Sequence, residues 1–279
     1  MIGMHRFEKL YCSRWNIGFI EQPVAEIMTG AETEFDVKWV KHRLTDRFFA
    51  DPFILSVEGG VIKVLVEEYF YNTKKGIITL LEVDVATYEL RRRKVVLEQP
   101  YHQSFPYIHR DGDRIYVLPE ASESGCLYRY EYDAVSEELV NRQLVVEEPL
   151  LDSTFVELDG KWWLLCTKRG GYSNRGLFVF ESERFEGPYT PINGSSPVIV
   201  DWDNARPAGY IERIDGKVYR STQVCTRSYG EYMKIFEVEA IDESGVNQKF
   251  VKEIHPKRSS TADRFTRLTD MATLRWLMV

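Results

Sequence analysis

Three carboxylates in this 279-residue chain stand beside short apolar runs, where their chemistry could be used. Asp51 and Asp152 each lie at the start of such a run, and Glu120 follows the run at residues 114–118. Paired carboxylates are the usual equipment for cleaving a glycosidic bond, because one donates a proton to the leaving oxygen while the other activates water or attacks the sugar. Asp51, Glu120 and Asp152 are therefore the candidate catalytic residues.

Basic and polar side chains occur at comparable places. The candidate substrate-binding residues are Glu68, His102, Ser104, Lys168, Arg206, Arg220 and Gln223. The guanidinium of Arg206 cannot serve as a proton donor near neutral pH, but its fork pairs with carboxylate or phosphate groups. With Lys168 or Arg220 nearby, we expect a locally positive site that favours an anionic sugar such as a uronic acid, a sialic acid or a phosphosugar.

The elements that must position these residues repeat along the chain. Tight-turn sequences precede four apolar runs at Gly59-Gly60, Asp111-Gly112-Asp113, Asp159-Gly160 and Asp215-Gly216. Such dipeptides suit hairpins because a type I′ turn needs positive φ at both central residues. The turn glycines at positions 60, 112, 160 and 216 lie 52, 48 and 56 residues apart. Each repeat contains four strand-like runs, which is the period of a β-propeller blade.

We predict one all-β domain over residues 1–279, a five-bladed β-propeller with four-stranded antiparallel blades. Blades should begin near residues 50, 104, 153 and 206. A fifth blade should form from about residues 15–40 together with the C-terminal segment, so that both chain ends close the ring. The alternative is a β-sandwich with accidental periodicity. Residues 261–279 have apolar spacing closer to that of a helix, and a short helix, an altered terminus and a cap remain open there.

Propeller geometry would bring the candidate residues together. The innermost strand of a blade starts at one mouth of the central channel, and the second strand returns to that mouth. The residues before the first strands are Asp51, His102 to Ser104, Asp152, Asn204 and Arg206. Counting eight residues from each turn glycine gives Glu68, Glu120 and Lys168, with Gln223 one residue earlier in its hairpin.

Each of these residues also has a structural interpretation. Asp51 precedes Pro52 and could simply form a turn, and Glu120 follows Pro119 and could do the same. Arg206 could bond carbonyl groups between blades. His102 is a residue type that more often completes its hydrogen bonds within a strand than binds a ligand.

Several motifs together resemble a known family pattern. They are Phe-Ala-Asp-Pro-Phe at residues 49–53, Val-Glu-Glu at 66–68, His-Gln-Ser-Phe-Pro at 102–106, Tyr-Val-Leu-Pro-Glu at 116–120 and Ala-Arg-Pro-Ala-Gly at 205–209. Their order and spacing resemble the propellers of glycoside hydrolase family 43. They are most similar to the family-43-like domain at the front of plant glucosamine inositolphosphorylceramide transferases and in bacterial relatives. The resemblance covers roughly residues 15–255.

The resemblance implies roles for individual residues. Asp51 would be the general base and Asp152 the residue that tunes the acid. Arg206 stands where the acid glutamate would be expected, so Glu120 or Glu68 would have to donate the proton. A second departure lies near the last blade, where such propellers carry a His-containing motif and only His255 is found.

Composition narrows the function classes. The net charge is −7, and the longest basic run is residues 91–94, which argues against a nucleic-acid partner. No apolar stretch is long enough for a membrane span. Residues 1–15 contain no apolar signal region, so we expect a cytoplasmic protein. The four cysteines form no C-x-x-C pair, and we expect no metal or other cofactor, although a calcium ion in the channel stays open.

The leading hypothesis is therefore a carbohydrate-active propeller of the glycosidase type, with a glycan as substrate. The alternative is a propeller that binds a glycan or glycolipid without catalysis, or an accessory module of a glycosyltransferase; Arg206 in the place of the acid favours it. A third hypothesis is a scaffold propeller whose sides bind protein.

Overall fold

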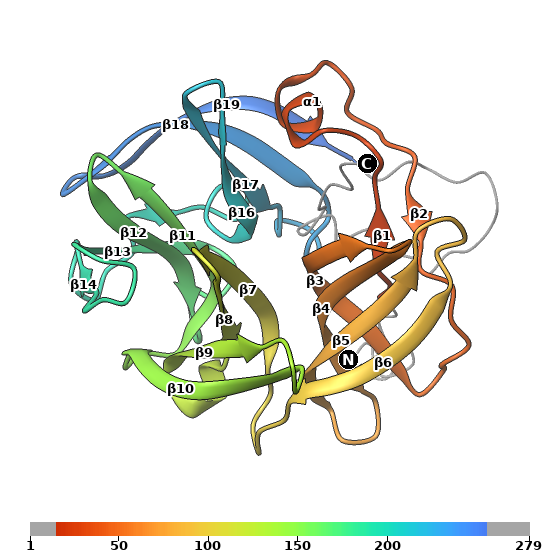
Figure 1. The fold of residues 1–279 in the computed structure, drawn as a ribbon. Coiled ribbons are helices and arrows are strands. Elements are labelled where there is room, and N and C mark those ends of the chain that lie inside the picture. The colour runs from red at the N-terminus through yellow and green to blue at the C-terminus, as the bar shows by residue number, and fades with distance from the viewer. Residues whose placement is uncertain (1–14, 256–279) are drawn as a thin grey trace, which may run out of the picture.

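The computed structural model describes residues 15–255, in which four antiparallel sheets are arranged as blades around a common axis (Figure 1). Blade one consists of β3 (Arg47–Glu58), β4 (Val61–Phe70), β5 (Lys75–Asp84) and β6 (Leu90–Leu97). Blade two consists of β7 (Ser104–Asp111), β8 (Arg114–Glu120), β9 (Leu127–Asp133) and β10 (Glu138–Val146). The predicted all-β propeller with four-stranded antiparallel blades is confirmed for these sheets and for the two that follow.

The remaining two blades have the same strand order. Blade three consists of β11 (Leu150–Leu158), β12 (Lys161–Lys168), β13 (Gly176–Ser182) and β14 (Thr190–Pro191), and β15 (Ile199–Val200) also pairs with β13. Blade four consists of β16 (Pro207–Ile214), β17 (Lys217–Gln223), β18 (Met233–Asp242) and β19 (Gly245–Ile254). The first strands β3, β7, β11 and β16 lie closest to the axis (Figure 1).

The N-terminal segment lies between blade four and blade one (Figure 1). It forms β1 (Gly18–Phe19) and β2 (Lys38–Trp39), which pair with each other, and the short helix α1 (Val24–Thr29). Ile17 and Phe19 pack into the core of blade one, whereas Ile27 and Phe35 pack against blade four. The same place in the ring was predicted for a fifth blade, but the described residues contribute two strands to it rather than four.

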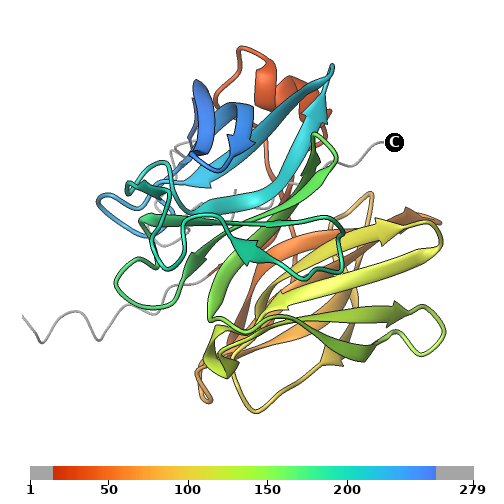
Figure 2. The ribbon, with the colours of Figure 1, turned by 90° about the vertical axis from the view of Figure 1, so that its left-hand side faces the viewer.

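Blade four holds this segment through its last strand. The Lys252 ammonium donates a hydrogen bond to the carbonyl oxygen of Gly30 at 2.7 Å, and the His255 amide donates one to Thr33 at 3.0 Å. Figure 2 shows α1 beside the strands of blade four from a second direction. The helix was not expected from the sequence; Pro23 precedes it, and its apolar Ile27 and Met28 are buried. Residues 256–279, including the segment with helical spacing, lie outside the described residues, so the single-domain organisation of residues 1–279 stays a prediction.

Aromatic rings from the innermost strands β3, β7 and β16 meet at the axis. The centroid of Phe53 lies 5.0 Å from that of Phe105 and 5.1 Å from that of Tyr210, and Tyr107 lies 4.8 Å from Tyr210. The Tyr210 hydroxyl donates a hydrogen bond to the Ile108 carbonyl at 2.7 Å, which ties blade four to blade two across the axis. The middle of the propeller is therefore a packed core, and a ligand at the mouth described below would rest on it.

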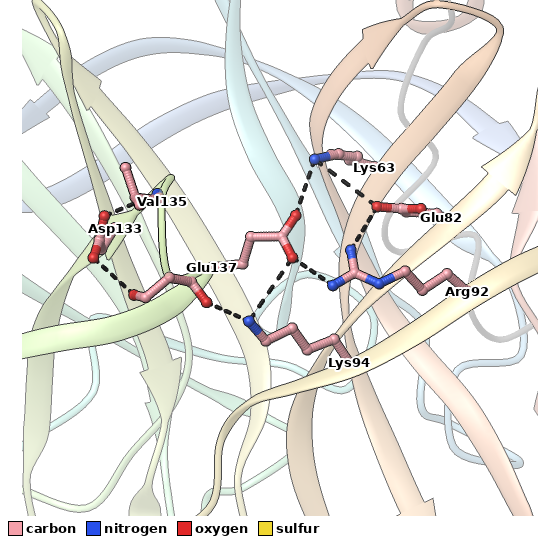
Figure 3. A network of polar contacts seen from close by, with 8 residues as sticks. Lys63, Glu82, Arg92, Lys94, Asp133, Val135 and Glu137 are labelled. Atoms are coloured by element: carbon pink, nitrogen blue, oxygen red, sulfur yellow. Dashed lines mark hydrogen bonds and ion pairs between the residues drawn. The ribbon is translucent and has the colours of Figure 1, made fainter.

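Charged side chains join the outer parts of blades one and two (Figure 3). Glu137, in the turn between β9 and β10, accepts hydrogen bonds from Arg92 at 2.6 Å and from Lys63 at 3.1 Å. Arg92 also pairs with Glu82 at 2.8 Å, and the Lys94 ammonium lies 3.8 Å from Glu137. Two residues of the basic run at 91–94, Arg92 and Lys94, thus make contacts between blades.

Candidate functional site

Asp51 and Asp152 occupy equivalent positions in blades one and three. In blade one the pairing of β3 with β4 shifts between Ala50 and Phe53, so that Asp51 lies in a β-bulge with φ of 50°. In blade three the shift falls between Leu151 and Thr154, and Asp152 has φ of 49°. Positive φ is strained for a residue other than glycine, and bulges beside functional sites commonly redirect a side chain.

Blade two has the same bulge with a different residue, because the pairing shifts between Ser104 and Tyr107 and Phe105 has φ of 41°. In blade four the shift lies between Pro207 and Ile211 and is one residue longer, and Gly209 there has φ of 122°. Each blade therefore has a bulge at this point, and only blades one and three place an aspartate in it.

Glu120 links blade two to this pair of aspartates. It ends β8 opposite Ser104, and its Oε2 accepts a hydrogen bond from the Asp152 backbone amide at 3.4 Å. The Ser122 hydroxyl donates to its Oε1 at 3.1 Å. Asp51 in turn accepts a hydrogen bond from the Phe105 amide at 3.1 Å. Three carboxylates from three blades are thus connected at one mouth of the propeller, which we call the carboxylate mouth.

Arg206 completes the carboxylate mouth from the segment before β16. Its Nε lies 2.5 Å from Oδ2 of Asp152, and both side chains are buried. Its Nη1 donates hydrogen bonds to the Ser173 carbonyl at 3.0 Å and to Asn174 Oδ1 at 2.8 Å. The guanidinium carbon lies 5.0 Å from the centroid of the Tyr229 ring. Arg206 therefore both bonds a neighbouring blade and pairs with one of the candidate carboxylates.

Burial and mutual repulsion raise two pKa values in the mouth. The pKa of Glu120 is raised to about 8, first by burial and then by the charge of Asp152, and Arg206 opposes this. The pKa of Asp51 is raised to about 7 by burial and by Asp152, while the Phe105 amide and Arg206 oppose the rise. Glu120 is therefore largely protonated at neutral pH, and Asp51 is close to the midpoint of its titration.

Ser104 and Gln223 lie at this mouth as well. Ser104 is buried opposite Glu120. Gln223 is buried at the end of β17, and its backbone amide donates to the Arg206 carbonyl at 3.0 Å.

Glu68 and Lys168 are not brought to the carboxylate mouth. Glu68 is fully buried among other partners, and it accepts hydrogen bonds from Arg47 at 2.8 Å, Arg93 at 2.5 Å and Thr79 at 2.7 Å. Lys168 pairs with Glu148, and its ammonium lies 4.3 Å from the centroid of Phe178.

A one-residue difference between the hairpin turns explains both placements. Gly112 is the first residue of its two-residue turn, whereas Gly60 and Gly160 are the second residues of theirs. The residues equivalent to Glu120 are therefore Glu67, which pairs with Ala50, and Thr167, which pairs with Leu151. Because side chains alternate along a strand, a slip of one residue points the side chain to the other face. Aligning the hairpin turns instead of their glycines would have found these two residues.

His102 lies between blades one and two, beside Glu67. Its Nδ1 accepts a hydrogen bond from the Gly76 amide at 2.9 Å, and its Nε2 lies 3.6 Å from Glu67 Oε1. Burial lowers the pKa of His102, which favours the neutral ring.

Arg220 supports the site indirectly. It is 2 % exposed, and its Nη2 donates to the carbonyl oxygens of Asn204 at 2.7 Å and Ala205 at 3.1 Å. Burial lowers its pKa to about 9. Arg220 thus fixes the segment that carries Arg206 and does not add a second cation beside it.

Tyr229 is a functional candidate that was not chosen from the sequence as a site residue. The residue is 42 % exposed, and its ring lies under the Arg206 guanidinium and meets Trp15 edge-on at 6.4 Å. An exposed aromatic face beside carboxylates is a surface on which a sugar ring can stack. Its position in the loop after β17, the second strand of blade four, could have indicated from the sequence that it lies near the mouth.

Several buried polar atoms of the innermost parts of the blades have no hydrogen-bond partner among the described residues. They include both amide atoms of Gln103, the hydroxyl groups of Ser153 and Thr167, and the side-chain oxygens of Asn204 and Gln223. Buried polar groups are normally paired, so such a set suits a hydroxyl-rich ligand or water. Within residues 15–255, no cluster of three or more His, Cys, Asp or Glu side chains is arranged to hold a metal ion. No helix in this range is long and apolar enough to cross a membrane.

The strand order and the polar mouth define a β-propeller of the kind found in carbohydrate-active proteins. A family model described as "Glucosamine inositolphosphorylceramide transferase 1, N-terminal" matches residues 22–264, and the chain belongs to this family. The resemblance seen in the sequence motifs is thereby confirmed.

Curated relatives agree with this assignment. The chain is 28% identical over 204 residues to glucosamine inositolphosphorylceramide transferase 1 of Oryza sativa subsp. japonica, a match that covers 70% of this chain and 26% of that protein. It is 28% identical over 209 residues to the protein of that name in Arabidopsis thaliana, covering 71% and 26%. The chain thus spans about a quarter of the length of these relatives.

Solved structures show the same fold at low sequence identity. The catalytic domain of the Coprinopsis cinerea GH62 alpha-L-arabinofuranosidase has a TM-score of 0.57 at 11% identity, covering 73% of this chain and 67% of that one. The Podospora anserina alpha-L-arabinofuranosidase PaAbf62A, in complex with cellotriose, has a TM-score of 0.56 at 8% identity, covering 95% and 78%. At these identities the likeness concerns the fold alone.

Proposed function

We propose that the carboxylate mouth binds a glycan or the sugar of a glycolipid without cleaving it, and that the domain is an accessory module of a glycosyltransferase. The observation that carries this proposal is the buried Arg206–Asp152 ion pair at 2.5 Å. The guanidinium of Arg206 stands where the resemblance to family 43 would require the proton donor. It forms an ion pair with Asp152, the carboxylate that would tune that donor. The family assignment supports the association with a glycosyltransferase.

The charge of the mouth favours a neutral or amino sugar over an anionic one. The anionic preference depended on Lys168 or Arg220 joining Arg206, and neither does. Asp152 already neutralises the Arg206 guanidinium, and the largely protonated Glu120 and the partly ionised Asp51 lie beside this pair. An ammonium or hydroxyl group would find acceptors there, and the ionised fraction of Asp51 would repel a uronic acid. Glucosamine is the sugar in the name of the curated relatives, and we propose an amino sugar of this type as a ligand.

Ligand-observed NMR with glucosamine, glucose and glucuronic acid tests this proposal. We expect glucosamine and glucose to bind more tightly than glucuronic acid. Tighter binding of glucuronic acid that weakens as salt rises would contradict it and restore Arg206 as an anion clamp.

Hydrolysis is the second candidate function, and the pKa of Glu120 favours it. A carboxyl group with a pKa of about 8 is protonated at neutral pH and could act as a general acid. Asp51 would then be the general base. This alternative requires turnover of a glycoside by the wild-type protein and its loss in both Asp51→Asn and Glu120→Gln.

We also propose that the segment at residues 15–40 belongs to a fifth blade. Its packing against both blade one and blade four supports this, as does the resemblance to five-bladed family-43 propellers. A crystal structure of the full chain should show further strands beside β1 and β2. A two-stranded sheet alone in this place would contradict the proposal.

A further inference from the structure

We propose that blade one carries a second binding site, a groove for a phosphate-type anion at the outer edge of the propeller. The groove lies between the segment after β2 and the start of β6, and it measures about 670 Å³. Its charged lining consists of Lys41, Arg43, Glu89, Arg91, Arg92 and Arg93. We call it the blade-one groove.

The two sides of the groove are joined by backbone hydrogen bonds. The Lys41 amide donates to the Tyr88 carbonyl at 2.8 Å, and the Leu90 amide donates to the Lys41 carbonyl at 3.1 Å. Lys41 and Glu89 form a parallel β-bridge. Two segments that are distant in the sequence are therefore held in register, so the groove is preorganised for a ligand.

The charge of the groove is positive although the chain carries −7. The three arginines pair with carboxylates at its border, Arg91 with Asp84, Arg92 with both Glu82 and Glu137, and Arg93 with Glu68. Their side chains nevertheless remain exposed by 47%, 44% and 32%.

Lys41 and Arg43 are the uncompensated charges of the groove. Both are exposed, and neither has an ion-pair partner among residues 15–255. Glu89 is the one acidic side chain in the lining. Two unpaired cations thus stand beside three guanidinium groups in one concave surface.

Phosphate is the anion that this donor set fits best. A guanidinium has five N–H donors in a planar fork, and the ion pairs described above leave some of them unused. Such forks pair with phosphate oxygens in bidentate fashion, while a lysine adds a point charge. The phosphate could belong to a soluble compound or to a lipid headgroup, and the groove chemistry is the same for both.

The test compares two lysine substitutions that change the charge equally. Lys41→Glu reverses a charge in the groove, and Lys249→Glu does so on the exposed face of β19 in blade four. Calorimetry with tripolyphosphate measures a soluble phosphate. Sedimentation with phosphatidylcholine vesicles, with and without phosphatidylserine, measures a headgroup.

We expect the wild type and Lys249→Glu to bind equally, and Lys41→Glu to bind at least about tenfold more weakly. Binding of tripolyphosphate alone would identify a soluble ligand, and binding of the phosphatidylserine vesicles alone would identify a headgroup; each outcome supports the groove. No binding of either probe, or equal weakening by the two substitutions, would overturn it. Sugar binding at the carboxylate mouth does not enter this readout.

Discussion

Asp152 Oδ2 lies 2.5 Å from Arg206 Nε, and this buried ion pair joins the bulge of blade three to the segment that leads into blade four. Nη1 of Arg206 donates hydrogen bonds to Ser173 and Asn174. Asp152, which by the family resemblance would tune a catalytic acid, is thereby paired with a buried guanidinium. The pair therefore supports the proposal that the carboxylate mouth holds a ligand without cleaving it.

Arg206→Met should destabilise the protein by about 3 kcal/mol, because it leaves the buried charge of Asp152 without a partner. Denaturant unfolding measures the difference, with Arg213→Ala at an exposed position as the control. Adding Asp152→Asn to Arg206→Met should recover part of the stability. No recovery would mean that Arg206 acts mainly through Ser173 and Asn174.

The raised pKa values of Asp51 and Glu120 predict that stability falls between about pH 5 and pH 8. The folded protein retains protons on these groups that the unfolded chain releases near its ordinary carboxyl pKa values. Their favourable contribution is therefore complete in acid and is lost as the pH rises through about 7 and about 8. Glu120→Gln should flatten this dependence in denaturant unfolding followed across the range. An unchanged slope would contradict the assignment.

Glu137 should show the opposite pH dependence. Hydrogen bonds from Arg92 are the main cause that lowers its pKa to about 2, so its contribution is present above about pH 4.5 and is lost as the pH falls toward 2. Glu137→Gln should cost about 1 kcal/mol at neutral pH, since the ion pairs lie close to solvent. Glu34→Gln, at an exposed position with no ion-pair partner within residues 15–255, is the control. Equal stability of the two variants would show that the network of Figure 3 contributes nothing.

Tyr229→Ala should weaken sugar binding by about fivefold, because it removes an aromatic face worth about 1 kcal/mol. The residue is 42 % exposed, so the free energy of unfolding should change less than for an aromatic residue of the core. Phe250→Ala removes a comparably exposed ring from β19 and should leave sugar affinity unchanged. Equal affinities of the two variants would place the ligand elsewhere.

Much of the architecture could be predicted because the signals are local. Tight turns at Gly60, Gly112, Gly160 and Gly216 mark one hairpin per blade, and their spacing gives the repeat. The bulge aspartates were found for the same reason, since each stands at the start of an innermost strand. Counting residues from the turn glycine failed in blade three. The glycine is the second residue of that turn but the first residue of the turn in blade two, so Lys168 was chosen although Thr167 is the residue equivalent to Glu120.

Other features depend on contacts between blades, which no local pattern contains. The Arg206–Asp152 pair joins segments of different blades. Arg220 bonds the backbone before β16, although its charge alone suggested a ligand contact. Helix α1 is stabilised by the apolar surface of blade four, against which Ile27 and Met28 pack. Because this contact is not visible in the local sequence, the segment was expected to form part of a blade.

The most direct test of the account is a calorimetric titration of the protein with an amino-sugar oligosaccharide, followed by an assay of the same sample for new reducing ends. We predict saturable binding without new reducing ends. Asp51→Asn should weaken the affinity by about tenfold, since it removes a charged hydrogen-bond acceptor. Asp113→Asn, which makes the same change at the opposite end of blade two, should not. Reducing ends that accumulate with the wild type and disappear in Asp51→Asn and Glu120→Gln would contradict the account and establish hydrolysis.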